Sequence, residues 1–564
     1  MSISNLVEEN WWWKPDFLDF LNELIKKSQK IASDESINYL RIKLTEEMEK
    51  RDPEFSEIKK PDTVLRIETI WMPSIFFLLR KNLLQDTIGD YVIISLRGPR
   101  RIGKTTLIKL LLREIFLESI FRRDTINPLK VVYIRCDRPG MGGEKGLADI
   151  IRDFLMRRAD QVGDVYIFLD EVSSLKNWQI AVKDLYDAGL LTKNKVKLFI
   201  SGSHSLDVRK SVEVLGLRKG VMLEGGNDKS LLPIKFSEYV YYREQLLGKR
   251  ELREFFTKDR FLEHEKRFQL LKQLIDPSNK IPPDLEKAQT YINELYAYFE
   301  DYLLTGGFPL AIRQYLTLGR IHPSVYFDFV DLAVKDAMKW RLNEDTLYSI
   351  IWQMLEAPGG PFSVVPIKEV STNSLAEKLG ISHNTVKEYL DYLVDAFVLL
   401  EVAKLKDVGK RTSSPKSPRK YYFWDPLMFY AFKAISAGYK DPFSMTQNML
   451  NNWKGPVVEM IVAINIAHMI LSLEVIQDLR LLRRKMFYYK PKPEKEIDFI
   501  IDINGKLIPI EVYSGNKINS EHMKKLANIS KQLKIRGLLI YTGKEMYINE
   551  QTIVIPAPLF MLLA

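Results

Sequence analysis

Cysteine and long hydrophobic runs are both scarce in this 564-residue chain. It contains one cysteine, Cys136, and six scattered histidines. A single cysteine excludes an internal disulfide and zinc sites built from several thiolates. No segment reaches the roughly 18 charge-free apolar residues that a membrane-spanning helix needs, and the nearest candidate, residues 461–473, contains Asn465 and His468. The N-terminal segment has acids where a signal peptide has basic and then apolar residues, so we expect a cytoplasmic location.

The residues that are present indicate several globular domains with a basic surface. Hydrophobic residues make up 46% of the chain, charged residues make up 28%, and the formal net charge is +10. A chain of this length is expected to form about three to five domains. The positive charge fits a polyanionic partner, and we favour DNA over a membrane because spanning segments are lacking.

The clearest motif lies at residues 91–112, which read YVIISLRGPRRIGKTTLIKLLL. Its apolar start predicts a buried strand, residues 98–105 match the pattern G-x-x-x-x-G-K-S/T, and helical periodicity follows. Such a loop wraps backbone N–H groups around phosphates at a helix N-terminus. We expect Lys104 to reach the β- and γ-phosphates of ATP and the Thr105 hydroxyl to bind Mg²⁺.

Three further apolar segments between residues 129 and 205 predict buried parallel strands that alternate with helices. The second ends in Asp170 and Glu171. We expect Asp170 to hold Mg²⁺ and Glu171 to orient and deprotonate the attacking water. The third ends at Ser201, a candidate contact to the γ-phosphate or to that water. The predicted nucleotide-binding residues are Gly98, Pro99, Arg100, Arg101, Ile102, Gly103, Lys104, Thr105, Thr106, Asp170 and Ser201.

A helix-turn-helix pattern occupies residues 371–405. It consists of a short amphipathic helix, a turn at Gly380, a second helix starting near Ser382 and an apolar segment that begins a wing. The following segment is basic and suited to clamp phosphates, although winged helices also bind proteins. The predicted DNA-binding residues are Lys404, Lys406, Lys410, Arg411, Lys416, Arg419 and Lys420.

Residues 496–515, EIDFIIDINGKLIPIEVYSG, resemble the acidic hairpin of PD-(D/E)xK nucleases. In such a site an Asp and two Glu side chains bind Mg²⁺, and a lysine helps to activate water. Glu459 on a preceding helix, Asp498 and Glu511 supply three carboxylates as candidate metal ligands, while Tyr513 stands at the lysine position.

The tyrosine changes the expected chemistry of this hairpin. A phenol supplies no cation at neutral pH, so cutting should be impaired unless a lysine such as Lys490 or Lys517 has taken over the role. We therefore expect a domain that holds nucleic acid without cutting it, with metal retained or lost. Near the other end of the chain, we expect Trp11–Trp13 to pack against the ATPase core or a neighbouring subunit.

The order of several motifs resembles a family of predicted archaeal and bacterial ATPases of the AAA+ superfamily. These motifs are RGPRRIGKTTLIKLL, YIRCD, YIFLDEVSSLKNWQIAVKDLYDAG, FISGSHS, GLRKG, LLPIKFSEYV and LTGGFP. The resemblance implies a C-terminal winged-helix and nuclease-like region. It also implies that Arg218, in GLRKG, acts in trans on nucleotide bound by a neighbouring subunit, which requires a homo-oligomer.

We therefore predict an α/β fold with a P-loop parallel-sheet core. The predicted parts are an N-terminal helical segment (1–85), an AAA+ ATPase core (86–240), a helical lid (241–345), a winged helix-turn-helix (346–425) and a nuclease-like domain (426–564). The predicted function is an ATP- and Mg²⁺-dependent ATPase that acts as a motor or remodelling protein on DNA. The alternatives are a nucleotide-switched scaffold that binds proteins and an active nuclease with a displaced lysine.

Overall fold

The computed structural model divides the chain into two compact units. The N-terminal unit contains mainly residues up to Leu231, and the C-terminal unit contains mainly Leu232–Ala564. The structure describes residues 6–28, 34–52, 74–84, 91–122, 126–203, 220, 226–247, 252, 260–355, 367–409, 412–413, 417–472, 479–491, 496–518 and 520–564.

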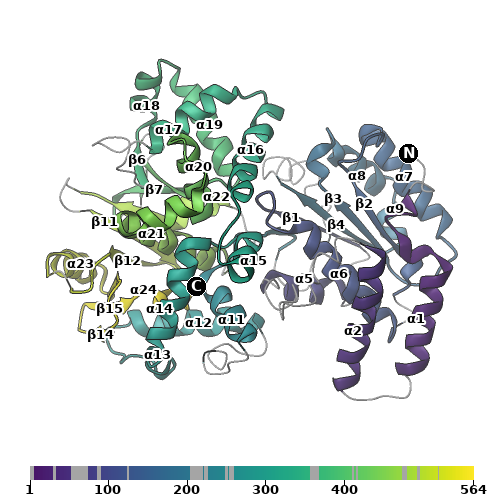
Figure 1. Cartoon of the computed structure of the whole chain (residues 1–564), viewed down its shortest axis with the longest axis horizontal. Coiled ribbons are helices and arrows are strands. Elements are labelled where there is room, and N and C mark those ends of the chain that lie inside the picture. The colour runs from purple at the N-terminus through teal and green to yellow at the C-terminus, as the bar shows by residue number, and fades with distance from the viewer. Residues whose placement is uncertain are drawn as a thin grey trace. The chain divides into compact units, whose positions relative to one another are not determined.

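The N-terminal unit is a parallel sheet with helices on both faces (Figure 1). Its elements are η2 (Trp11–Trp13), α1 (Pro15–Ser28), α2 (Asp34–Arg51), α5 (Ser74–Leu84), β1 (Val92–Arg97), α6 (Lys104–Ser119), η3 (Pro128–Lys130), β2 (Val131–Arg135), α7 (Gly143–Arg157), β3 (Val165–Asp170), η4 (Val172–Ser174), α8 (Trp178–Asp187), α9 (Leu190–Lys193), β4 (Val196–Gly202) and β5 (Asp228–Ser230).

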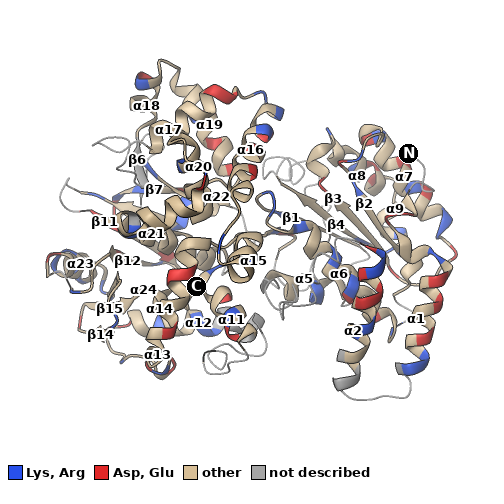
Figure 2. Cartoon of the chain, viewed as in Figure 1, with Lys and Arg blue, Asp and Glu red and all other residues tan. Residues whose placement is uncertain are grey.

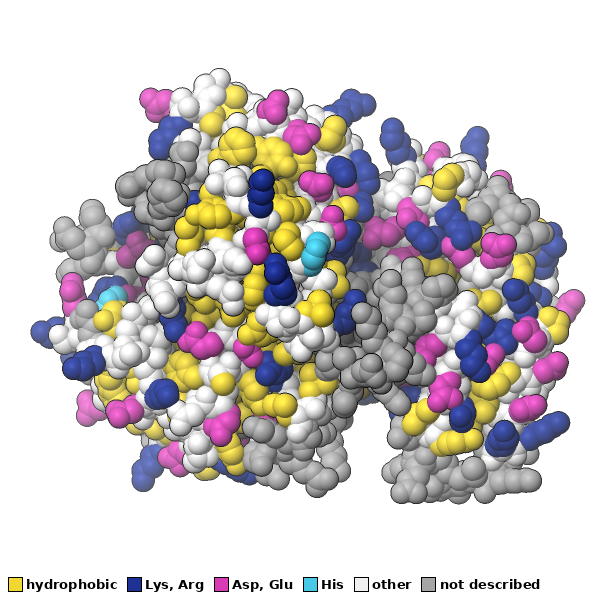
Figure 3. All heavy atoms as spheres, viewed as in Figure 1, with side chains coloured by type: hydrophobic (Ala, Val, Ile, Leu, Met, Phe, Trp, Pro, Cys, Tyr) yellow, Lys and Arg dark blue, Asp and Glu magenta, His cyan; other side chains and the backbone are white. Residues whose placement is uncertain are grey.

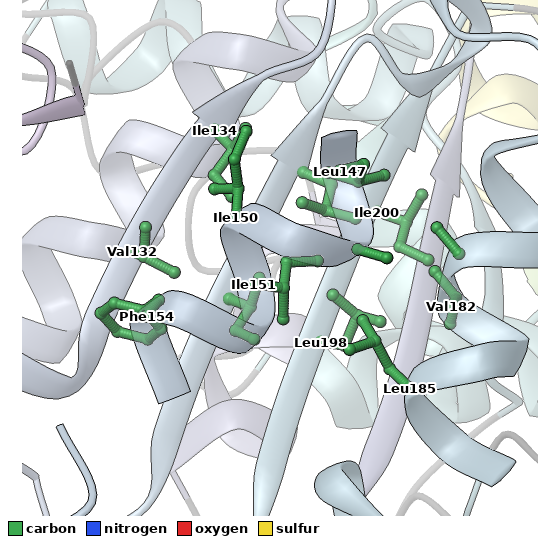
Figure 4. Packing of buried hydrophobic residues seen from close by; sticks show 14 of the residues in the cluster. Val132, Ile134, Leu147, Ile150, Ile151, Phe154, Val182, Leu185, Leu198 and Ile200 are labelled. Carbon is green, nitrogen blue, oxygen red and sulfur yellow. The ribbon is translucent and has the colours of Figure 1, made fainter. Parts of the chain in front are cut away.

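The predicted parallel sheet is confirmed, with strand order β2-β3-β4-β1-β5. Strands β1, β3 and β4 are buried along their whole length, as their continuous apolar sequences require. One face packs against α7 and α8, where Ile151 and Leu185 meet strand residues such as Leu198 (Figure 4). Because all five strands are parallel, their carboxyl ends lie along one edge and bring the predicted site residues together.

Side chains from the N-terminal segment cover the β2 edge of this sheet. The Asn10 side chain donates to the Tyr133 carbonyl (2.9 Å) and accepts from the Tyr133 N–H (2.7 Å). The indoles of Trp12 and Trp13 both donate to the Val131 carbonyl, at 3.0 and 2.9 Å. An unpaired strand edge is a template for aggregation, and these contacts satisfy hydrogen-bonding groups of the β2 backbone. The expected packing of the tryptophans on the ATPase core is thus confirmed.

The C-terminal unit combines a helical region with a second sheet (Figure 1). Its helices are α11 (Phe236–Leu246), α12 (Arg260–Ile275), α13 (Pro283–Gln289), α14 (Ile292–Thr305), α15 (Pro309–Leu318), α16 (Pro323–Lys339), α17 (Glu344–Leu355), α18 (Thr372–Leu379), α19 (His383–Asp395), α20 (Pro426–Ser436), α21 (Pro442–Ser472), α22 (Leu479–Lys485), α23 (Ser520–Leu533) and α24 (Ala557–Met561). Its strands are β6 (Ile367–Val370), β7 (Leu399–Asp407), β8 (Thr412–Ser413), β9 (Arg419–Phe423), β10 (Met486–Tyr489), β11 (Ile497–Ile503), β12 (Lys506–Tyr513), β13 (Gly537–Tyr541), β14 (Tyr547–Ile548) and β15 (Thr552–Pro556).

One ten-stranded sheet runs through the predicted wing and into the predicted nuclease-like region. Its order is β14-β15-β13-β12-β11-β10-β7-β9-β6, with β8 paired to β7. Strand β7 of the predicted wing pairs with β10 in parallel, so the sheet is continuous across the predicted boundary at residues 425 and 426. The predicted hairpin forms as antiparallel β11 and β12, joined by Asn504 and Gly505 with φ of 50° and 78°.

A buried carboxylate holds the turn at Gly306 in place. Asp425 accepts hydrogen bonds from the N–H groups of Gly307 (2.6 Å) and Leu427 (2.8 Å). A Cβ atom at Gly306 would lie 2.0 Å from Asp425 Oδ1, so a larger residue does not fit there. Burial raises the pKa of Asp425 to about 7, against the lowering effect of the two hydrogen bonds.

The central helix α21 contains a segment, Lys454–Ser472, that is long and apolar enough to cross a membrane by length and composition. Within the structure, 72% of this window is buried. The same composition is therefore accounted for by packing inside the C-terminal unit, as in the core helix of a globular domain.

Candidate functional site: a phosphate-binding loop and a carboxylate cluster

The loop after β1 leads directly into the N-terminus of α6. Gly103, at the N-cap, has a φ of 98°, and Arg101 has a φ of 60°. Lys104 begins the helix with a side chain only 3% exposed, and its Nζ donates to the carbonyls of Gly98 and Pro99, both at 3.0 Å. The loop thus places the free N–H groups of a helix N-terminus beside a buried ammonium group, which is an anion-binding arrangement.

Asp170 receives hydroxyl groups from three different elements. Thr105 Oγ1 donates to Asp170 Oδ2 at 2.7 Å, and the Tyr133 hydroxyl donates to the same oxygen at 2.9 Å. Ser201 Oγ donates to Asp170 Oδ1. The structure therefore brings the predicted residues Thr105, Asp170 and Ser201 into one network. Sequence reasoning missed this role of Tyr133, although the residue begins the motif YIRCD, because its contact with Asp170 depends on the pairing of β2 with β3.

Glu171 stands next to this network in an unusual backbone conformation. It has a φ of 51°, and its N–H donates to Asp170 Oδ1 (3.1 Å) and Ser201 Oγ (3.2 Å). Its carboxylate lies 3.9 Å from Lys104 Nζ and remains 24% exposed. A non-glycine residue in the left-handed region costs about 1–3 kcal/mol and is typical of functional sites. The surrounding contacts hold Glu171 with its side chain partly open to solvent.

Several other predicted nucleotide contacts lie on the same loop and helix. Ile102 is fully buried, Arg101 is exposed, and Thr106 is half-buried one residue after Thr105. Arg218, the residue predicted to act in trans, lies outside the described residues.

The three predicted nuclease-like carboxylates come from α21, β11 and β12. Asp498 is half-buried, with 14% of its side chain exposed, and its Oδ2 accepts the Val512 N–H at 2.8 Å. Burial, followed by the charges of Glu511 and Glu459, raises the pKa of Asp498 well above its usual value, against the lowering effect of Lys420. The three acids therefore lie close enough to repel one another, as the hairpin pattern predicts.

Lys420 on β9 extends its ammonium group into this cluster. Its Nζ lies 3.4 Å from Glu459 Oε1 and 4.0 Å from Asp498 Oδ1, and it forms an ion pair with Glu496. Its side chain is 7% exposed. The expectation that Lys420 contacts DNA from a flexible wing is therefore wrong: strand pairing holds β9 in the sheet, and the side chain points into the unit.

Glu511 has its own basic partners on α23. Its Oε1 pairs with His522 Nδ1 at 2.7 Å and forms an ion pair with Lys525. Tyr513 lies beside His522, with ring centroids 5.0 Å apart. Of the two lysines named as possible replacements, Lys490 pairs with Glu496 at 3.0 Å. Sequence reasoning missed Lys420, Lys525 and His522 in this role because their positions depend on sheet and helix packing.

The carboxylates of this cluster do not form a recognisable metal site. Among the residues that the structure describes, no group of three or more His, Cys, Asp and Glu side chains is arranged to hold a metal ion. The oxygen atoms point instead to lysine, tyrosine and backbone donors.

Two helices form at the positions expected for the helix-turn-helix pattern. Helix α18 ends at Gly380, and α19 begins after Ser382, whose hydroxyl accepts the Thr385 N–H at 3.0 Å. On the start of α19, His383, Asn384 and Lys387 are exposed.

The predicted wing residues differ strongly in exposure. Lys406 is exposed, whereas Lys404 is half-buried and lies 6.0 Å from the ring centroid of Tyr488. Arg419 is 18% exposed and pairs with Glu401 at 3.2 Å. Lys410, Arg411 and Lys416 lie outside the described residues.

Three family models match separate parts of the chain. Residues 90–240 match the family described as an AAA domain. Residues 296–438 and 472–560 match two domains of unknown function, DUF8612 and DUF4143.

Two curated relatives are uncharacterized proteins of Mycobacterium bovis and Mycobacterium tuberculosis, each 22% identical over 187 residues. The match spans 32% of this chain and 37% of the length of each relative.

Solved structures that align with part of the chain include the Walker-type ATPase PABY2304 of Pyrococcus abyssi. It has 12% identity and a TM-score of 0.36, and the alignment covers 67% of this chain and 99% of that one. The ORC1 protein of Aeropyrum pernix, solved in complex with DNA, has 14% identity and a TM-score of 0.28, covering 69% and 95%. With its P-loop, its parallel sheet and the family match, the N-terminal unit contains an AAA-type ATPase domain.

Proposed function

We propose that this chain is an ATP-hydrolysing motor or remodelling protein that acts on DNA, and that its nuclease-like C-terminal region binds without cutting. The observation that carries the proposal is the network at the carboxyl edge of the first sheet. There Lys104, Thr105 and Asp170 from separate elements meet beside Glu171.

Each group in this network has a distinct role in hydrolysis. The N–H groups at the start of α6 and the Lys104 ammonium bind the phosphates of ATP, since both favour negative charge. Glu171 orients a water molecule toward the γ-phosphate and accepts its proton. Its partly exposed carboxylate leaves room for that water. Ser201 and Tyr133 fix the orientation of Asp170.

The residues around Asp170 suit Mg²⁺. Thr105 Oγ1 and Asp170 Oδ2 are both oxygen donors, the ligands that Mg²⁺ prefers, and they lie 2.7 Å apart. The side chains that contact Asp170 among the described residues carry the neutral hydroxyl groups of Thr105, Tyr133 and Ser201, so its negative charge is available to a cation. When bound with ATP, the ion neutralises charge on the β- and γ-phosphates.

Hydrolysis is proposed to depend on a neighbouring subunit. Arg218 supplies positive charge to the transferring phosphate in trans, which makes the active form a homo-oligomer. An Arg218→Ala variant should bind ATP at the parent level and hydrolyse it slowly. Normal turnover by this variant would remove Arg218 from the mechanism.

The DNA interface is proposed on α19 and on the neighbouring basic segment. The exposed His383, Asn384 and Lys387 present hydrogen-bonding groups at the start of α19. Lysine and arginine are interspersed with acids over the elements of both units (Figure 2), so a local interface fits better than a uniformly basic face. The phosphate contacts are assigned to Lys406, together with Lys410, Arg411 and Lys416 from the wing.

The test is an ATPase assay with and without double-stranded DNA. We expect DNA to stimulate hydrolysis by the parent chain. A variant with Lys406, Lys410, Arg411 and Lys416 changed to Ser should keep its basal rate and lose the stimulation. If the ATPase rate of the parent chain is the same with and without DNA, the result would favour the scaffold function described next.

A second candidate function is a nucleotide-switched scaffold that binds a protein partner. It is favoured by an aromatic pair on α17, where the half-buried Tyr348 and the 41% exposed Trp352 have ring centroids 5.6 Å apart. Figure 3 shows hydrophobic side chains gathered in the upper part of the C-terminal unit. Exposed aromatic side chains are enriched at protein interfaces. Changing both residues to Ser should then abolish partner capture and leave ATPase activity intact.

A further inference from the structure

The carboxylate cluster of the C-terminal unit contains its own cation. The Lys420 ammonium contacts carboxylates from three positions, Glu459 on α21, Glu496 just before β11 and Asp498 within β11. Two of these acids are the ligands that the hairpin pattern assigns to a metal ion. The ammonium therefore lies close to two acids that a metal ion at this cluster would also have to contact.

The formal charges of the cluster are nearly balanced without any added ion. Its four carboxylates are Glu459, Glu496, Asp498 and Glu511, and its three ammonium groups are Lys420, Lys490 and Lys525. Four negative and three positive charges leave one net negative charge. The three ammonium groups therefore offset most of the repulsion among these acids, and a divalent ion is not needed to hold them together.

The oxygen atoms of the cluster also have partners that compete with a metal. Glu459 Oε1 accepts from the Tyr422 hydroxyl at 3.0 Å as well as from Lys420. Asp498 Oδ2 accepts the Val512 N–H, and Glu511 Oε1 pairs with His522 and Lys525. Glu511 Oε2 is buried without a hydrogen-bond partner among the described residues, so it is the oxygen most available to an incoming cation.

We propose that the Lys420 ammonium replaces the divalent cation of this cluster, so that the C-terminal unit keeps its acids together without metal and does not cut nucleic acid. This inference deepens the non-cutting part of the proposed function. It does not depend on DNA binding, because its readout is cation binding, whereas DNA-stimulated ATPase activity tests the rest.

The test measures Mn²⁺ binding to the full chain in the absence of nucleotide, by calorimetry and by thermal shift. Lys420→Met keeps most of the side-chain volume and removes the charge. It should bind Mn²⁺ at least about tenfold more tightly than the parent chain, because one repelling charge within a few ångströms has gone. The bound ion should also raise the melting temperature of this variant.

Three matched variants assign any gain to the cluster. Lys406→Met removes the same charge from an exposed position on β7 and should bind Mn²⁺ like the parent chain. Lys420→Arg keeps the cation and should show no gain. Adding Glu459→Gln to Lys420→Met should abolish the gain, which separates this site from the phosphate-binding loop.

Two results would overturn the proposal. One is a folded Lys420→Met variant with unchanged Mn²⁺ affinity. The other result does not use Lys420→Met. It is tight Mn²⁺ binding by the unaltered protein that is lost in Glu459→Gln, together with metal-dependent nicking of DNA that is lost in Asp498→Ala. Lys420 would then lie beside a bound metal ion instead of replacing it, and the chain would be a nuclease with a displaced lysine. Mn²⁺ binding and DNA nicking by the unaltered protein therefore test the proposal even if Lys420→Met does not fold.

Discussion

The two units contain carboxylate centres that differ in how their charge is balanced. Asp170 in the N-terminal unit receives hydroxyl groups from Thr105 and Tyr133, which orient a carboxylate without neutralising it. Asp498 in the C-terminal unit lies beside the buried ammonium of Lys420. Hydroxyl partners leave a charge for an external cation, whereas an ammonium group satisfies it internally. The comparison separates a carboxylate that keeps its charge, as the proposed Mg²⁺ site requires, from one that is already paired with a cation.

The largest expected effect concerns the first centre. Glu171→Gln keeps the side-chain shape but cannot accept a proton, so ATP should bind and hydrolysis should fall by about 10²–10⁴-fold. Lys104→Ala should lose binding as well as turnover, because the ammonium group contacts the phosphates. Fluorescent nucleotide binding and phosphate release separate the two variants. Parent-level hydrolysis by Glu171→Gln would assign the base to another residue.

The next prediction compares two buried basic groups of the C-terminal unit. Burial lowers the pKa of Lys420, but Tyr422 and the surrounding acids outweigh it and raise the pKa well above its usual value. For His468, burial and then the charge of Lys235 lower the pKa to about 4, against the raising effects of Glu238 and the Pro233 backbone. One group keeps its charge because acids surround it, and the other is held neutral.

The consequence for His468 is a loss of stability in acid. Between pH 6.5 and 4 the unfolded chain binds a proton at this histidine and the folded chain does not, so unfolding becomes easier as pH falls. The full effect is about 3 kcal/mol, and Asp425 opposes it, since its raised pKa favours the folded state in acid. His468→Gln should therefore lose less stability than the parent chain on acidification, measured by urea denaturation of both at pH 7 and pH 5. Parallel losses would contradict a neutral buried histidine.

A third prediction concerns basic residues that are already paired and those assigned to DNA. If Lys406, Lys410, Arg411 and Lys416 neutralise four phosphates, their part of the slope of log affinity against log salt is about −3.6. Changing these four to Ser should flatten the slope by that amount. Changing Arg419 alone to Ser should leave it unaltered, because its guanidinium is bound to Glu401. Equal effects of the two changes would show that pairing does not decide which residues contact DNA.

The smallest expected effect is that of Tyr133→Phe. It removes one of the hydroxyl groups that position Asp170, and the lost hydrogen bond should weaken this positioning by about 0.5–1.5 kcal/mol. The Mg²⁺ concentration that gives half-maximal ATPase activity should rise a few-fold, while the affinity for nucleotide without metal should stay the same. A uniform loss of folding stability with no change in Mg²⁺ dependence would give Tyr133 a purely structural role.

Local motifs made the first site predictable. The loop at residues 98–105 needs consecutive residues, and the acids at Asp170 and Glu171 follow directly from the end of an apolar strand. Parallel strands bring these ends to one edge, so the sequence was enough to place Thr105 and Asp170 together. The hairpin at residues 497–513 and the helices around Gly380 were predictable for the same reason, because turn residues and periodicity act over short distances.

The sequence by itself determined which segments become strands and helices, the chemistry of the phosphate-binding loop and the presence of three acids in the C-terminal unit. Only the tertiary structure decided that Lys420 joins those acids and that Tyr133 holds Asp170. Lys420 lies in a basic stretch of sequence and was expected in solvent. Strand alternation and sheet packing turn its side chain inward, and the paired acids offset the cost of burying its charge. Charge patterns along a chain are local, whereas the partner of a buried charge is set by contacts between residues far apart in sequence.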